Sequence, residues 1–244
     1  MVYLVLVAAT LVTSLISGVL SMTGGMILMG VFGFFLSVPA AMVLHGIAQT
    51  FSNGSRVWLY RDHIRWGILA PYTAGALLVL AVFSVLVVVP PMALVFIMIG
   101  LFPFIAMVLP KSIDLDMQRW PVAFLCGVVV TLAQMLAGAS GPVLDIFYVK
   151  SSLTRQEILG TKAITQTLGH ILKLVYYGAL LFTASSVLPL WVVPAVVVAA
   201  IAGNWLGAKV VARMSDDSFK KIGRYVIMVI GAIYIGQGGW LLLS

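Results

Sequence analysis

Long apolar stretches separated by short polar connections run along the chain. A helix that crosses the hydrocarbon core of a bilayer needs about 20 mostly apolar residues. The pattern therefore predicts an all-helical, polytopic membrane protein. Six stretches are predicted to span: residues 40–60, 66–89, 92–109, 156–181, 187–212 and 221–243.

Two further apolar runs do not fit a single crossing helix. Residues 2–37 are too long for one span and too short for two full spans with a loop between them, and they are interrupted at 23–25. Residues 120–149 are interrupted in the same way at 139–142. Glycine permits sharp turns, and irregular backbone at membrane depth is tolerated where protein buries it. Each run is therefore predicted to form a hairpin of two helical legs that enters and leaves on one face.

Basic residues gather on one side of this topology. Suppose that each hairpin comes back to the face it entered. The connections on one side, with the adjoining helix ends, then hold 10 of the 14 basic residues. The connections on the opposite side hold no charged residue. Cytoplasmic loops are enriched in Lys and Arg. The charged side is therefore expected to be cytoplasmic and both termini outside, in a bacterial inner membrane. The charged connections span residues 61–65, 111–119, 150–155 and 213–220.

The composition excludes several classes of protein. Apolar residues make up 62% of the 244 residues and charged residues only 9%, with a mean hydropathy of +1.16. A soluble enzyme, a nucleic-acid binder and a disordered chain are therefore excluded. The topology accounts for most of the net charge of +7, so no nucleic-acid partner is expected. The single cysteine, Cys126, indicates no metal cluster, and no cofactor is expected.

The two halves of the chain repeat each other. A shift of 117 residues aligns 48–60 with 165–177 and the break at 23–24 with that at 140–141. Each unit is a hairpin followed by three crossing helices, which gives about eight segments. A hairpin returns to the face it entered, so each unit crosses the membrane three times. Because three is an odd number, the second unit begins on the opposite face and is inverted relative to the first, as in many secondary transporters. The predicted units are residues 1–110 and 120–244, joined by a cytoplasmic linker at 111–119 within one transmembrane domain.

Polar side chains follow one face of two predicted helices. His45, Gln49, Asn53 and Arg56 recur at helical spacing, and the same shift places them on polar positions of the helix at 156–181. A lysine near the bilayer centre costs about 2.5–3.5 kcal/mol on insertion scales. A small anionic solute is the favoured compensation for Lys162, His170 and Lys173.

Other readings of these charges stay open. Asp145 is able to pair with Lys162 or Lys173 as a structural ion pair, or to couple transport to protons. Arg56 and Lys209 are able to extend their charges to the cytoplasmic surface. For Lys209 that reading is favoured, whereas Arg56 fits both.

The hairpin tips supply a second argument for an anion. Helical N-H groups without partners favour negative charge where the second legs restart, after Gly25 and after Gly141. The alternative is that these glycines only allow close helix packing. The predicted anion-binding residues are Thr23, Gly24, Gly25, His45, Gln49, Asn53, Arg56, Ser140, Gly141, Lys162, Gln166, His170 and Lys173.

Several segments resemble the sulfite exporter TauE/SafE family over nearly the whole chain. They are a Gly-rich break (SGVLSMTGGMILMGVFGFFLSVPAAMVLHG), a basic loop ending in tryptophan (YRDHIRWGILAPYTAGALL), and a second copy of both (AGASGPVLDIFYV, then WVVPAVVVAAIAGNWLGAKVVARM). The resemblance implies two four-helix repeats, transport of small sulfur-containing anions such as sulfite or organosulfonates, and no bound cofactor. The family's glycine cluster at the first break is here Thr-Gly-Gly.

The sequence therefore predicts a secondary transporter, and not an enzyme. It is expected to export sulfite or organosulfonates such as sulfoacetate by alternating access, in contact with the lipid bilayer and as a possible homo-oligomer. One alternative is a rhomboid-like intramembrane serine protease, because residues 138–141 read GxSG and His170 is a candidate base. A passive anion channel is the other alternative.

Overall fold

The computed structural model describes residues 1–20, 23–108, 115–148, 151–183, 188–211 and 216–244, and every regular element in these ranges is helical. Two short 3-10 turns, at Arg61–His63 and Trp66–Ile68, lead into α4. The α-helices are α1 (Val2–Leu20), α2 (Thr23–Phe35), α3 (Val38–Leu59), α4 (Leu69–Leu86), α5 (Met92–Val108), α6 (Trp120–Ala137), α7 (Gly141–Ile146), α8 (Arg155–Thr183), α9 (Val192–Val211) and α10 (Asp216–Leu243).

The long helices coincide with the predicted spans to within a few residues at most ends. α3 covers Val38–Leu59 where 40–60 was predicted, and α8 covers Arg155–Thr183 where 156–181 was predicted. By length and composition, three segments of the described chain are able to cross a membrane: Trp66–Leu86, Trp120–Ala137 and Tyr225–Leu243. α3 and α8 carry the polar faces that the sequence indicated. The count of eight spanning segments stays a prediction.

Both interrupted runs fold as two helices, but the first break lies earlier than predicted. α2 begins at Thr23, so Gly24 and Gly25 lie in its first turn, and the connection at 21–22 falls outside the described residues. In the second run α6 ends at Ala137, and Gly138 follows with a φ of 77°. This left-handed conformation favours glycine and ends the helix.

The second leg of the second hairpin is short. α7 contains only 6 residues, whereas α2 contains 13. Pro142 stands in the first turn of α7, where its missing N-H breaks no helical hydrogen bond. The two hairpins therefore share a design but differ in length.

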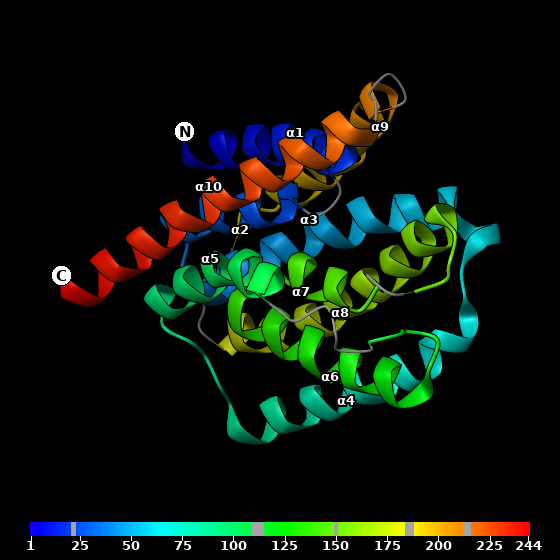
Figure 1. Cartoon of the computed structure of the whole chain (residues 1–244). Helices are drawn as coiled ribbons and strands as arrows, with labels where there is room; N and C mark the ends of the chain where they lie inside the picture. The colour runs from blue at the N-terminus through cyan, green and yellow to red at the C-terminus, as the bar shows by residue number, and fades with distance from the viewer. Residues whose placement is uncertain (21–22, 109–114, 149–150, 184–187, 212–215) are drawn as a thin grey trace.

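α3 and α8 pack against each other in the middle of the molecule (Figure 1). α1 packs on α9 along one side, and α6 packs on α4 along the other. Glycines bring these backbones close together. An added Cβ at Gly203 would meet the backbone of Leu11, and one at Gly127 would meet the backbone of Tyr72. Such small residues are typical of helix contacts in membranes.

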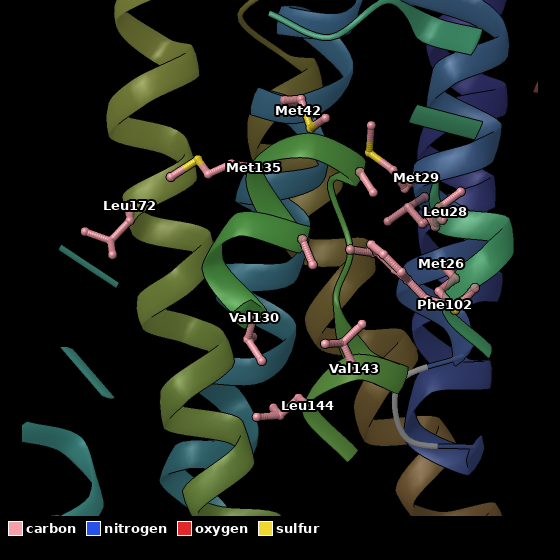
Figure 2. Packing of buried hydrophobic residues seen from close by; sticks show 14 of the residues in the cluster. Met26, Leu28, Met29, Met42, Phe102, Val130, Met135, Val143, Leu144 and Leu172 are labelled. Carbon is pink, nitrogen blue, oxygen red and sulfur yellow. The ribbon is translucent and has the colours of Figure 1, made fainter. Parts of the chain in front are cut away.

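Methionines fill the space around the second hairpin (Figure 2). Met29 of α2 and Met135 of α6 are each at most 1% exposed. An added Cβ at Gly138 would collide with the side chain of Met29, so the two hairpins touch at this point. Flexible methionine side chains suit such an irregular junction.

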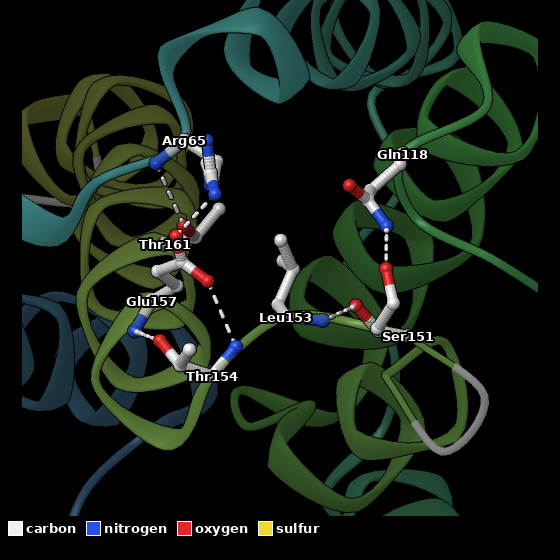
Figure 3. Close-up of polar contacts among 8 residues, drawn as sticks. Arg65, Gln118, Ser151, Leu153, Thr154, Glu157 and Thr161 are labelled. Carbon is white, nitrogen blue, oxygen red and sulfur yellow. Dashed lines mark hydrogen bonds and ion pairs between the residues drawn. The ribbon is translucent and has the colours of Figure 1, made fainter.

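Three polar connections meet at one end of the molecule (Figure 3). Arg65 forms an ion pair with Glu157, and its backbone N-H donates to Oγ1 of Thr161 at 3.0 Å. Nε2 of Gln118 donates to Oγ of Ser152 at 2.8 Å. Arg65 therefore lies beside the first turns of α8, and Gln118 lies beside the connection at 150–155 that leads into this helix.

Candidate functional site

Lys173 joins the two hairpin tips through His45. Nζ of Lys173 lies 2.8 Å from Nδ1 of His45 and donates to the carbonyl oxygen of Gly138 at 2.8 Å. The other ring nitrogen of His45, Nε2, lies 2.9 Å from the carbonyl oxygen of Gly25. Gly25 belongs to the first hairpin and Gly138 to the second. One cation and one imidazole from the central helices therefore connect both breaks.

An amide and hydroxyl network lies at the second hairpin. Oγ of Ser140 donates to Oε1 of Gln134 at 3.1 Å and accepts from Nε2 of Gln166 at 3.4 Å. Nε2 of Gln134 is buried and has no hydrogen-bond partner within the described chain. Gly169 makes room for this amide, because an added Cβ there would stand 2.6 Å from Oε1 of Gln134.

A matching amide lies at the first hairpin. An added Cβ at Gly25 would stand 3.3 Å from Oε1 of Gln49, so this glycine faces the site. Nδ2 of Asn53 donates to the same Oε1 at 3.5 Å, and Nε2 of Gln49 has no partner in the described residues. Gly24 faces away from the site, because an added Cβ would collide with the carbonyl of Thr13 and with Ser17. The packing alternative therefore describes Gly24, whereas Gly25 lies beside the polar residues.

His170 approaches the same cluster from α8. Its ring lies 5.4 Å from that of His45, centroid to centroid, at an interplanar angle of 63°. Nδ1 of His170 is buried and unpartnered in the part of the chain that the structure describes. The two histidines therefore lie close together, and His45 is the one that contacts Lys173.

The charge of Lys162 is compensated, unlike that of Lys173. Its ammonium forms an ion pair with Asp145, the carboxylate of α7. The structural ion pair was one of the readings that the sequence left open. Lys162 precedes Lys173 by eleven residues, which is about 16 Å along a helix.

Arg56 and Lys209 lie toward the charged end. Nε of Arg56 donates to Oδ1 of Asn204 at 3.0 Å, while its buried Nη2 has no partner in the described ranges. Arg56 therefore belongs to a contact between α3 and α9, about 16 Å along the helix from His45. Lys209 is exposed, and its Nζ lies 3.4 Å from the centroid of the Trp205 ring. This exposed position agrees with the expectation that Lys209 extends its charge to the surface.

The electrostatics of the site follow from these contacts. Within the described residues, no carboxylate lies within ion-pair distance of Lys173, which is 0% exposed. No group of His, Cys, Asp and Glu in this part of the chain is suited to hold a metal ion. The cluster presents one positive charge, two unpartnered amide groups and one imidazole nitrogen. Such a set of groups is suited to bind a small anion.

Two residues of this region were not predicted from the sequence, Gln134 and Asn204. A signal for Gln134 was present, because the 117-residue shift places it on Ser17 in the first leg of the first hairpin. Oγ of Ser17 is also buried without a partner among the described residues. Thr23 and Gly141 are buried in the first turns of α2 and α7, next to the cluster.

Comparison with known proteins gives the family. The model of the family described as "Sulfite exporter TauE/SafE" matches residues 6–234 of the 244 residues. Neither the curated proteins nor the solved structures include a significant match to the chain. The match covers both halves and all the residues of the cluster. The chain therefore belongs to the sulfite exporter TauE/SafE family, a family of membrane transporters for sulfite-type anions.

Proposed function

We propose that the protein is a secondary transporter that exports small sulfur-containing anions such as sulfite or organosulfonates, sulfoacetate among them. The observation that carries this proposal is Lys173, a fully buried cation with no carboxylate partner in the described chain. An uncompensated lysine at membrane depth costs about 2.5–3.5 kcal/mol on insertion scales, and an anionic solute offsets that cost. The family match supplies the sulfur chemistry.

The contact between α3 and α8 supports two inverted repeats. These helices are equivalent under the 117-residue shift. An added Cβ at Gly46 would meet Leu174 near one end of the pair. One at Gly160 would meet Tyr60 near the other end, so the two helices run antiparallel. Equivalent helices run antiparallel when a repeat is inverted in the membrane.

The remaining helix pairs support the same symmetry. α1 packs on α9, and α6 packs on α4. α1 and α6 are the first legs of the two hairpins, and α4 and α9 are the fourth helical elements of the predicted repeats. Exchanging the two repeats therefore exchanges these contacts. We place eight membrane segments on this basis, with the two hairpins as the broken helices.

The burial of the site supports a carrier over a passive channel. His45, Gln134, Ser140, Gln166 and Lys173 are each at most 4% exposed. Neither side of the membrane has access to the cluster in this conformation, so solute exchange requires the hairpins to move. Alternating access around the repeat interface provides such movement. A channel, in contrast, offers one continuous pore.

Orientation follows from the charged connections. The end that carries Arg65 and Arg119 is assigned to the cytoplasm, and both termini are assigned to the outside of the bacterial inner membrane. In this orientation Arg56 and Lys162 lie nearer the cytoplasm than Lys173 does. Arg56, whose buried Nη2 has no partner in the described residues, is a candidate for a first contact with an anion that leaves the cell, whereas Lys162 is held by Asp145.

Counterflow in proteoliposomes tests the function. The wild-type protein is expected to exchange radiolabelled sulfite for internal sulfite or sulfonate with saturation. Lys173→Ala is expected to lower the rate by about 10-fold or more, since the anion loses its only close cation. Lys209→Ala, which removes an exposed lysine, serves as the control and is expected to keep the wild-type rate. Absence of sulfur-anion exchange in the wild type, or an unchanged rate in Lys173→Ala, contradicts the proposal.

A further inference from the structure

An apolar groove follows α9 on the outer surface of the helix bundle. A cavity of about 700 Å³ lies between α3 and α9, and most of its wall is apolar. A second cavity, of about 600 Å³, lies between α1 and α9, which pack side by side (Figure 1). Val198 and Ala202 line both cavities, so the two are continuous. We call this continuous space the α9 groove.

The α9 groove is about as long as the acyl layer of one membrane leaflet. It extends along α9 from Trp205 to Pro194, which are about 16 Å apart on a helix. The hydrocarbon core of a bilayer is about 30 Å thick, so one leaflet contributes about 15 Å. The wall residues Val198 and Ile201 are 66% and 41% exposed, so they face the surroundings of the protein. Length and apolar character therefore both suit an acyl chain.

Two cations stand on the tryptophans at one end of this groove. Cζ of Arg61 lies 4.8 Å from the centroid of the Trp58 ring. Nζ of Lys209 lies 3.4 Å from the centroid of the Trp205 ring. Both rings line the first cavity, so both charges lie beside the same space. The attraction between a cation and an aromatic face holds each charge near the groove.

Little negative charge balances these cations. Arg61 forms an ion pair with Asp62 at 4.0 Å, but the two side chains are 52% and 78% exposed, so water weakens the pair. Lys209 forms no ion pair within the described residues. A third cation stands behind the wall, because Nε of Arg56 donates to Asn204, which lines the cavity. This end of the groove therefore carries an excess of positive charge.

We propose that the α9 groove binds one anionic phospholipid from the leaflet at the charged end of the molecule. One acyl chain lies along α9, and the phosphate lies at Arg61 and Lys209. Trp58 and Trp205 stand between the two, at the headgroup level where tryptophan is enriched. A zwitterionic lipid carries its own ammonium and gains less from two cations.

The charges also favour a lipid over a second copy of the chain. A symmetric contact between two copies through this face brings two sets of Arg61 and Lys209 together, and like charges in an interface repel each other. The α9 groove shares no lining residue with the cluster around Lys173. The proposal is therefore independent of the transport function, and the transport rate is not expected to depend on this lipid.

Native mass spectrometry of the purified full-length protein tests the charge preference. Phosphatidylglycerol and phosphatidylcholine with identical acyl chains are compared. The wild type is expected to bind phosphatidylglycerol about 10-fold more tightly. Arg61→Ala combined with Lys209→Ala is expected to lower this affinity to that for phosphatidylcholine. Equal affinity for both lipids in the wild type, or a preference that survives in the double variant, overturns the proposal.

A second double variant controls for net charge. Arg119→Ala combined with Arg155→Ala removes the same charge from residues that do not line the groove. It is expected to keep the wild-type preference for phosphatidylglycerol. A preference that is lost to the same extent in both double variants reflects net charge alone and overturns the site.

Filling the groove tests where the acyl chain lies. Val198→Trp is expected to lower the affinity for both lipids by about 10-fold, because the larger side chain occupies the space of the chain. Val85→Trp on α4, where Val85 is 81% exposed, is the matched control and is expected to bind as the wild type does. Unchanged binding by Val198→Trp overturns the groove as the site. Dimers without bound lipid in the wild-type spectra, absent from Val198→Trp, assign the groove to a second copy instead and likewise overturn the proposal.

Discussion

Nζ of Lys173 lies 2.8 Å from Nδ1 of His45, although 128 residues separate them in the chain. Each residue also binds a backbone carbonyl at one hairpin, Gly138 for Lys173 and Gly25 for His45. The contact therefore links both broken segments to the central helix pair. An anion that draws Lys173 away from His45 changes the support of both tips at once, which gives a physical route from binding to movement.

Replacing His45 tests this link. His45→Leu removes the contact with Lys173 and leaves the carbonyl of Gly25 without its donor. We expect the counterflow rate to fall by about 10-fold or more. His63→Leu, a change at an exposed histidine in the polar connection, is expected to keep the wild-type rate. Wild-type exchange by His45→Leu, at equal amounts of folded protein, shows that the link is dispensable.

The ion pair between Lys162 and Asp145 is expected to stabilise the fold rather than to bind the solute. Asp145→Asn leaves Lys162 without its ion-pair partner, and the side chain of Lys162 is only 10% exposed. Because the Asp145 side chain is 50% exposed, we expect a loss of only about 1 kcal/mol, measured as a lower unfolding temperature in detergent.

A double variant separates stability from coupling at this pair. Lys162→Met combined with Asp145→Asn removes both charges and is expected to recover the unfolding temperature. The same protein is expected to transport within about 3-fold of the wild type. Lost transport in a stable double variant indicates instead that the pair takes part in transport, either through contact of Lys162 with the anion or through proton coupling by Asp145.

The sequence predicted most of the helices to within a few residues, because polar connections between long apolar stretches mark where each helix ends. The second break was also predictable, since Gly138 and Pro142 end one helix and start the next. The first break was misplaced because Gly24 serves a contact with α1, and no local pattern reveals which helix a glycine faces.

The pairing of the interior charges was not predictable from the sequence. From the sequence, Asp145 was a candidate partner for both Lys162 and Lys173 of α8. Only the structure assigns it to Lys162. Gln134 was overlooked because α6 is mostly apolar, with Thr131 as its other buried polar side chain. Its role depends on Ser140 and Gly169, which follow it by 6 and 35 residues.

Gly24 is expected to tolerate no side chain. An added methyl group would collide with the backbone of Thr13 and Ser17, and overpacking of this kind costs about 1–3 kcal/mol or more. Gly24→Ala should therefore lower the unfolding temperature or the yield of monodisperse protein. Gly178→Ala is the matched control, because an added Cβ there meets no atom within 4 Å. Equal behaviour of the two variants contradicts the close packing of α1 on α2.

Ser140 is not expected to act as a nucleophile. Its hydroxyl donates to Gln134 and accepts from Gln166, and no hydrogen bond to His170 occurs in the described residues. A serine protease requires its hydroxyl to face a base. We expect a fluorophosphonate probe to leave the purified protein unlabelled. Labelling that disappears in Ser140→Ala would restore the protease alternative.

Cysteine labelling tests the orientation, because the chain holds one cysteine, Cys126, which is 0% exposed. In a Cys126→Ala background, Asp62→Cys places a thiol at the charged end, and Leu190→Cys places one in the connection before α9, where Leu190 is 89% exposed. An impermeant maleimide added to intact spheroplasts is expected to label position 190 and not position 62. Position 62 should become reactive only after the membrane is opened. The reverse pattern would mean that the orientation is opposite to the one proposed. Labelling of both positions from outside would mean that the two connections do not lie on opposite faces of the membrane.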